Sequence, residues 1–128
     1  MTDHTQVLGK HPRRGNIHVD EELVELLELL WENGVETHFS CQGGPDEKYG
    51  EVEGYILLGW GRKEVPDFMA WLPGMESLKP HWRDKQHTRQ VLLDRVGYYT
   101  EYNRYSDSLC IRFRNDMITV LHDLLSMR

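Results

Sequence analysis

The sequence lacks a long apolar run. No stretch reaches the roughly 18 residues that a membrane-spanning helix needs, and residues 1–10 are polar, without the apolar core of a secretory signal peptide. These absences argue against a membrane protein and against an exported one. We therefore expect a protein of the cytoplasm.

Cysteine is also scarce, since the 128 residues contain only Cys41 and Cys110. In a chain without an export signal we expect two reduced thiols and no disulfide framework. The chain has seven histidines but contains no Cys-x-x-Cys or His-x-x-x-His motif. We therefore expect neither a zinc site nor a cofactor. His4, His11 and His18 recur every seven residues in a polar segment, and this spacing predicts no role for them.

Positive charge is in short supply. The chain has 15 lysines and arginines against 21 acidic residues, a net charge of -6, which argues against broad binding to extended nucleic acid. The deficit is uneven, because residues 1–75 hold 14 of the acidic residues but only 6 of the basic ones. An anion site is thus expected in the second half of the chain.

The apolar content is sufficient for one core, with 39% hydrophobic and 10% aromatic residues. This composition is too apolar for a disordered chain, and the length is typical of one domain. Residues 1–18 contain Pro12 and Gly15 and show no periodicity, so we expect a flexible or loosely tied N-terminal arm. A single α/β domain is expected over residues 19–128.

The first periodic segment begins at Asp20, a residue type that caps helices. Leucines follow at helical spacing, with glutamates on the opposite side: Leu23, Leu26, Leu27 and Leu30. Asn33-Gly34 supplies the left-handed residue that ends such a helix. Alternation from Val35 to Ser40 then predicts a strand.

The rest of the pattern predicts an α+β fold: a two-layer sandwich in which a twisted, largely antiparallel sheet carries helices on one face. The expected elements are a central strand at Gly54–Trp60, helices at Lys63–Leu72 and Leu78–Val96, strands at Tyr98–Asn103 and Ser108–Arg114, and a helix at Asp116–Met127. The second of these helices is expected to bury Leu78, Trp82, Leu92 and Val96. The core is expected to combine the four leucines of the first helix with Leu57, Ile111, Phe113, Leu121 and Leu124. Alternation on the last strand leaves Cys110, Arg112 and Arg114 on the open face.

The segment Glu36-Thr37-His38-Phe39-Ser40-Cys41-Gln42-Gly43 lies between a helix and the strand Gly54-Tyr55-Ile56. This arrangement resembles small bacteriophage-encoded proteins in which a Ser-Cys-x-Gly turn follows a threonine-bearing strand. It is similar, more distantly, to the wybutosine-pathway tRNA methyltransferases, whose C-terminal half also resembles Gly97-Tyr98, the strand Leu109-Cys110-Ile111-Arg112-Phe113-Arg114 and the helix after it. Gly44 stands where that family usually has arginine, and its later Ser-Asn and Trp motifs find no match. The resemblance implies a fold and a turn, but not methyl transfer.

Ser40-Cys41-Gln42-Gly43-Gly44 is the most specific local feature. Two glycines after a strand allow backbone N–H groups to point at one anion, to which the serine and glutamine side chains add neutral hydrogen bonds. The alternative is a turn in which the glycines only permit positive φ and Cys41 is a small buried hydrophobe. Catalysis by Cys41 requires a base, and His38 alternates to the opposite strand face, so we expect no catalytic residue.

Arg112 and Arg114 supply the cations that an anion at this turn needs. With Tyr98 or Tyr102 on the neighbouring strand, they can bind phosphate through forked hydrogen bonds and stack against a base. The alternative is a solvated sheet face on which the arginines pair with Glu101 or Glu36.

These features support three hypotheses of function. The first is a phage-type accessory protein that binds a nucleotide-like or other anionic small ligand without turnover, at Ser40 to Gly44, Arg112, Arg114 and Tyr98, and so sequesters a host defence signal. The second is an inhibitor or adaptor that binds a host protein through the open sheet face or the acidic helix face. The third is an RNA-modifying enzyme, which the methyltransferase resemblance implies and the net charge disfavours. Pairing of both arginines with carboxylates favours the second hypothesis. A membrane partner is not expected, and homo-oligomers are left open.

Overall fold

A computed structural model describes residues 4–46, 48–59, 85–103 and 108–127 of the chain. The strands are β1 (Gln6–His11), β2 (Gly15–Asp20), β3 (Thr37–Cys41), β4 (Gly44–Asp46), β5 (Gly50–Val52), β6 (Gly54–Gly59), β7 (Tyr98–Asn103) and β8 (Ser108–Phe113). The helices are α1 (Val24–Glu32), α3 (Lys85–Arg95) and α4 (Ile118–Ser126), with short 3-10 turns at Glu21–Leu23 and Asn115–Met117. The helix expected at Lys63–Leu72 and the start of the one expected at Leu78 lie outside the described residues.

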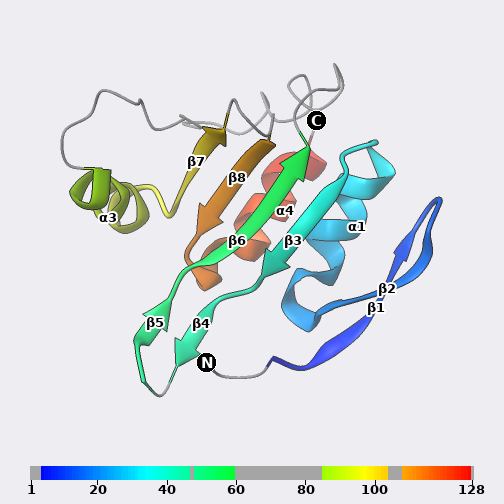
Figure 1. Cartoon of the computed structure of the whole chain (residues 1–128), viewed down its shortest axis with the longest axis horizontal. Helices are drawn as coiled ribbons and strands as arrows, with labels where there is room; N and C mark the ends of the chain where they lie inside the picture. The colour runs from blue at the N-terminus through cyan, green and yellow to red at the C-terminus, as the bar shows by residue number, and fades with distance from the viewer. Residues whose placement is uncertain (1–3, 47, 60–84, 104–107, 128) are drawn as a thin grey trace.

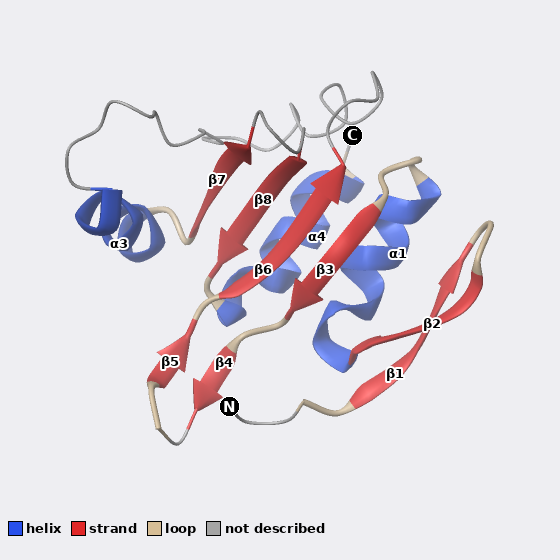
Figure 2. Ribbon diagram, viewed as in Figure 1, coloured by secondary structure: helices blue, strands red, loops and turns tan. Residues whose placement is uncertain are grey.

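The main sheet has four strands in the order β3-β6-β8-β7, and every neighbouring pair is antiparallel. Helices α1 and α4 lie side by side behind this sheet and cover one of its faces (Figure 2). Helix α3 lies beside β7, at the edge opposite β3 (Figure 1). The expected α+β fold, with a largely antiparallel sheet and helices on one face, is confirmed. None of the helices that the structure describes is long and apolar enough to cross a membrane.

The N-terminal segment forms a hairpin, whereas the sequence suggested a flexible or loosely tied arm. Strands β1 and β2 pair from Gln6 opposite Asp20 to His11 opposite Gly15. The hairpin packs against α1, where Gly9 lies so close to the Trp31 ring that a Cβ would be 3.1 Å from it. The backbone N–H of Lys10 also donates to the α1 residue Glu28 at 2.7 Å.

One core lies between the main sheet and the two helices behind it. The buried side chains include Leu23, Leu26, Leu27, Leu30, Ile56, Leu58, Ile111, Phe113, Leu121 and Leu125. Burial of the four leucines, of Ile111, of Phe113 and of Leu121 is thus confirmed. Leu57 was wrongly assigned to the core, because pairing of Gly54 with Phe113 directs Ile56 and Leu58 to the helices and Leu57 to the open face. Leu124 is only half-buried against the core, and Leu125 takes the buried position.

The helix ends follow the expected chemistry in part. Gly34 ends α1 with a φ of 80°, as predicted. Asp20 makes no capping hydrogen bond, because its carboxylate is turned toward β3. Among the described side chains of α3, Leu93 is buried and Leu92 is half-buried. Val96, which follows α3, is exposed, so its predicted burial was wrong, and the predicted burial of Leu78 and Trp82 lies outside the described residues.

Strands β3 and β6 continue past one end of the sheet into β4 and β5. These two short strands pair with each other, Gly44 opposite Val52, and form a ribbon that projects from the sheet (Figure 1). The expected turn at Ser40 to Gly44 is the bend between the sheet and this ribbon.

Candidate functional site

Gly43 and Gly44 form the bend between β3 and β4. Their φ angles are 69° and 106°, both in the region that favours glycine. A Cβ on Gly43 would lie 2.5 Å from the backbone nitrogen of Gly54 and 2.5 Å from the carbonyl oxygen of Val52. The bend therefore requires glycine at position 43 for reasons of backbone conformation and space.

Polar groups of Gln42, in the middle of the turn, are directed to the chain itself. The backbone N–H of Gln42 donates to Asp20 Oδ2 at 3.0 Å, and its Oε1 accepts from the backbone N–H of Glu22 at 3.2 Å. The carbonyl of Gln42 accepts from Asn115 Nδ2 at 3.1 Å. One backbone N–H of the turn, that of Gln42, thus faces a carboxylate of the protein.

Ser40 and Cys41 lie on opposite faces of β3. Ser40 is opposite Ile56, which is buried beneath the helices, whereas Cys41 is opposite Tyr55 on the open face. Tyr55 is in turn opposite Arg112. Cys41, Tyr55 and Arg112 therefore form one row across the open face.

Arg112 lies on the open face, as predicted, and is paired with carboxylates on both sides. Its guanidinium is 3.3 Å from Glu53 and 3.8 Å from Glu101, and it lies over the Tyr55 ring at 5.6 Å from the ring centre. With these contacts, the side chain of Arg112 is 35% exposed. Two carboxylates offset the single positive charge, so this part of the face does not attract an anion.

Arg114 follows the end of β8. Its Nε is 3.1 Å from Asp116, and its Nη1 donates to the backbone carbonyl of Asp94 at the end of α3. Both predicted cations are thus paired with carboxylates, the arrangement that favours a protein partner.

The expected placement of Tyr98 beside Arg112 is wrong, because the residue of β7 that pairs with Arg112 is the next one along the strand. Tyr98 is opposite Phe113 and is 4% exposed, within the core, and the backbone of Tyr102 is opposite Leu109 on the same side of β7. Burial raises the pKa of Tyr98. The β7 residue opposite Arg112 is Tyr99.

Cys110 lies on the open face between Leu57 and Glu101. Burial raises the pKa of its thiol; Arg112 opposes this rise, and Glu101 and Glu53 add to it. A thiol with a raised pKa stays protonated at neutral pH, so Cys110 is not an activated nucleophile.

A groove runs along the outer edge of β3, between this strand and β2, and no strand in the described part of the chain pairs with this edge. We call this groove the edge groove; its volume is about 260 Å³. It is lined by His11, Arg14, Ile17, His18 and Val19 of the hairpin, by Leu27 and Trp31 of α1, and by Thr37, His38, Phe39 and Ser40 of β3. Trp31 is fixed by a hydrogen bond from its Nε1 to Thr37 Oγ1 at 3.0 Å.

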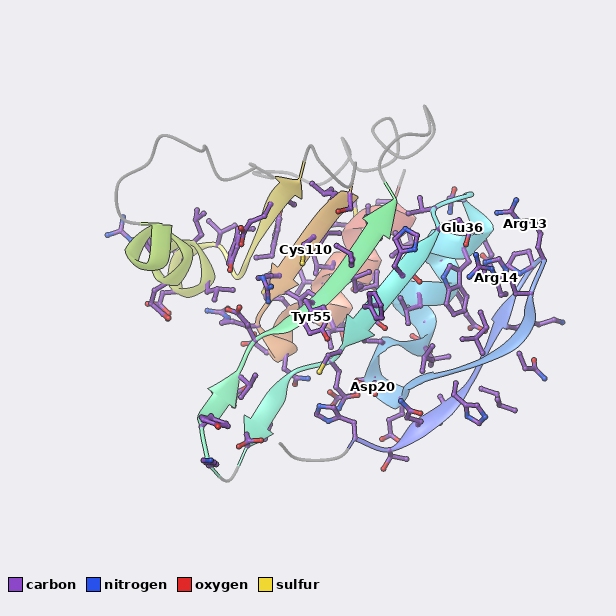
Figure 3. All side chains as sticks on the ribbon, viewed as in Figure 1. Arg13, Arg14, Asp20, Glu36, Tyr55 and Cys110 are labelled. Atoms are coloured by element: carbon purple, nitrogen blue, oxygen red, sulfur yellow. The ribbon has the colours of Figure 1, made fainter. Side chains whose placement is uncertain are left out.

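The loop between β1 and β2 closes one end of this groove. Nδ1 of the buried His11 accepts the backbone N–H groups of Arg13 and Arg14, both at 3.1 Å, so the ring hydrogen lies on Nε2, which is 3.3 Å from Glu36. Arg13 and Arg14 also pair with Glu36 (Figure 3). Burial raises the pKa of Glu36, but the hydrogen bonds from His11 and Arg13 and the nearby positive charges outweigh it, so that pKa lies below its ordinary value.

Sequence reasoning missed a cluster of potential metal ligands. His4, Asp20 and Cys41 each offer a ligand atom, and these atoms all lie within 4.8 Å of one another. The three residues come from three separate segments, so no short spacing in the sequence could have indicated the cluster.

No protein-family model matches the chain, and neither a curated protein nor a solved structure is significantly similar to it.

Proposed function

We propose that the chain is a non-catalytic binding protein of the cytoplasm that captures an extended segment of a partner protein as an added strand beside β3. The observation that supports this function is the edge groove itself. Strand β3 ends the sheet order β3-β6-β8-β7, and its outer edge, which no strand among the described residues pairs with, borders the groove.

A free strand edge offers unpaired backbone N–H and C=O groups to an incoming strand. Strand addition of this kind obtains affinity from main-chain hydrogen bonds and selectivity from side-chain pockets. The groove supplies such a pocket between β3 and β2, and the buried side chains of Leu27 and Trp31 lie beneath it. Phe39 of β3 is 68% exposed and offers a further apolar contact at the rim.

The charge of the groove favours an acidic segment. Arg14, His18 and His38 line it, and none of its described lining residues is acidic. Arg14 shares one carboxylate, Glu36, with Arg13, so one positive charge of this pair of arginines is left without a carboxylate partner among these three residues. Opposite charges across an interface set selectivity and speed encounter. The resemblance of the Ser-Cys-x-Gly turn to bacteriophage-encoded proteins makes a host protein the partner that we propose.

The same contacts weigh against the other two hypotheses. Arg112 and Arg114, the cations expected to bind a small anion at the glycine turn, are already paired with carboxylates, and the N–H of Gln42 donates to Asp20. Modification of RNA requires attraction to a polyanion, which the net charge opposes.

A displayed library of linear peptides tests the proposal. We expect enrichment of acidic, β-branched sequences, and the best peptide should bind the Arg14→Glu variant about tenfold more weakly, the effect of losing one charge-assisted contact. A copy of the peptide with alternate backbone nitrogens methylated should also bind at least about tenfold more weakly, because strand addition depends on main-chain donors.

The matched control is Arg112→Ala, which removes a cation from the open face and not from the groove. It should bind the peptide as the wild type does. Failure to enrich any peptide contradicts the proposal, as does a peptide whose binding survives both Arg14→Glu and backbone methylation. A rise in thermal stability with a panel of nucleotides, lost in Arg112→Ala, would instead favour the small-anion hypothesis.

A further inference from the structure

Three side chains with different donor atoms converge where the N-terminal segment, β2 and β3 meet. His4 precedes β1, Asp20 ends β2 and Cys41 ends β3. A nitrogen, an oxygen and a sulfur atom from them lie within 4.8 Å of one another. Figure 3 shows Asp20 at this junction, near the end of β3 that leads into β4.

The position of His4 is set by its neighbours in the chain. Pairing of Gln6 with Asp20 places the start of β1 beside the end of β2. The carbonyl of Thr5 also accepts the backbone N–H of Glu21 at 2.9 Å. These bonds hold His4 next to Asp20 in the fold.

Asp20 is a buried carboxylate with only uncharged donors. It is 7% exposed, and its oxygens accept the backbone N–H of Gln42 at 3.0 Å and Nε2 of Gln6 at 3.5 Å. Within the part of the chain that the structure describes, no lysine or arginine pairs with it. A buried charge without an opposite charge is costly, so a bound cation stabilises this arrangement.

The donor set selects the kind of cation. Imidazole nitrogen, thiolate sulfur and carboxylate oxygen are the three ligand types of zinc, whereas magnesium and calcium prefer oxygen alone. Zinc bond lengths place tetrahedral ligand atoms about 3.3 to 3.6 Å apart. Convergence from 4.8 Å requires shifts of about 1 Å, which rotation of the half-buried His4 and Cys41 side chains can supply.

A small cavity provides space for a fourth ligand. It has a volume of about 20 Å³ and is lined by two of the three side chains, His4 and Cys41, and by Gly43, Gly44, Pro45, Asp46 and Val52. This volume accommodates one water molecule. The donors Gln42 and Gln6 hold the Asp20 carboxylate in place, as outer hydrogen-bond partners do for metal ligands.

We propose that His4, Asp20 and Cys41 bind one zinc ion with water as the fourth ligand. The ion fastens the β1–β2 hairpin to the end of β3, because its ligands come from both. The inference stands apart from the proposed function, since it involves neither the edge groove nor a partner.

Zinc titration of the full chain, stripped of metal with a chelator, tests the site directly. We expect one zinc ion per chain by elemental analysis and a thermal midpoint that rises with zinc. Cobalt in its place should give a thiolate-to-metal charge-transfer band. His4→Gln and Cys41→Ser should each weaken zinc binding at least about tenfold, and Cys41→Ser should lose the cobalt band.

The matched controls are Cys110→Ser and His18→Gln, which remove the same residue types elsewhere and should bind zinc as the wild type does. His4→Gln keeps the test valid if Cys41→Ser fails to fold, because residue 4 precedes the first strand. Binding of less than one ion per chain overturns the proposal, as does unchanged binding in His4→Gln. Rapid alkylation of Cys41 that depends on His4 but is insensitive to zinc would also overturn it, in favour of a cysteine–histidine pair.

Discussion

Replacement of Gly43 by alanine tests why the bend between β3 and β4 contains glycine. The glycine is needed either for the backbone conformation and close packing of the bend or for the approach of a bound anion. The φ of 69° at Gly43 lies in the left-handed region, which costs a residue with a Cβ about 1 to 2 kcal/mol. The new Cβ would also lie 2.5 Å from backbone atoms of Val52 and Gly54, which cannot rotate away. Overpacking of this kind costs a further 1 to 3 kcal/mol or so. We therefore expect Gly43→Ala to lower the free energy of unfolding by about 2 to 5 kcal/mol.

Gly15→Ala is the matched control for this change. Gly15 has a similar φ of 74°, but a Cβ there would meet no atom within 4 Å. Its expected cost is the conformational part alone, about 1 to 2 kcal/mol. Urea unfolding followed by tryptophan fluorescence measures both variants against the wild type.

Equal costs for the two variants would refute the packing argument. A cost below about 1 kcal/mol for Gly43→Ala would do the same, because neither strain nor close contact could then be present. Tolerance of alanine at this position would mean that the glycine serves the approach of a ligand, and the anion-binding hypothesis would regain its main support.

Two further predictions concern the core and the loop that closes the groove. Leu27→Ala should lower the free energy of unfolding by about 2 to 5 kcal/mol because Leu27 is fully buried. Leu57→Ala, on the open face, should lower it by less than about 1.5 kcal/mol in the same urea assay. Equal costs would contradict the observed register of β6. Glu36 has a pKa in the folded state that lies below its ordinary value of 4.5, so its contribution to stability is present above that value and is lost as the pH falls through the folded-state pKa. The thermal midpoint of the wild type should therefore fall more steeply than that of Glu36→Gln between about pH 5 and pH 3, and parallel curves would contradict the assignment.

The elements that could be predicted from sequence are those with one buried face. The leucine periodicity of α1 and its glycine end are local signals, because one side of this helix meets the sheet and the other meets water. Strand β8 could be placed for the same reason: Leu109, Ile111 and Phe113 are buried, while Cys110 and Arg112 alternate with them on the open face.

Strand β7 could be located, but its two faces could not be told apart. Tyr98, Tyr99 and Thr100 are 4%, 1% and 1% exposed, so successive residues are buried on both sides of the strand. Alternation of polar and apolar residues disappears under these conditions, and with it the information that distinguishes the faces. The error over Tyr98 follows from this lack of signal. The error over Leu57 has another cause: Ile56, Leu57 and Leu58 are all apolar, so the sequence shows no alternation, although only Ile56 and Leu58 are buried.

The N-terminal hairpin has little pattern because its packing relies on small and polar residues. Gly9 meets Trp31 with no side chain of its own, and His11 is buried while it serves the loop backbone. The three histidines spaced seven apart occupy three different environments: His4 lies in the ligand cluster, His11 closes the loop and His18 lines the edge groove. Polar side chains that interrupt a hydrophobic pattern are also those able to bind a metal ion or an acidic segment. The N-terminal segment, which showed the weakest pattern in the sequence, therefore contributes residues to both proposed sites. Its polar composition accounts both for the weak pattern and for these binding residues.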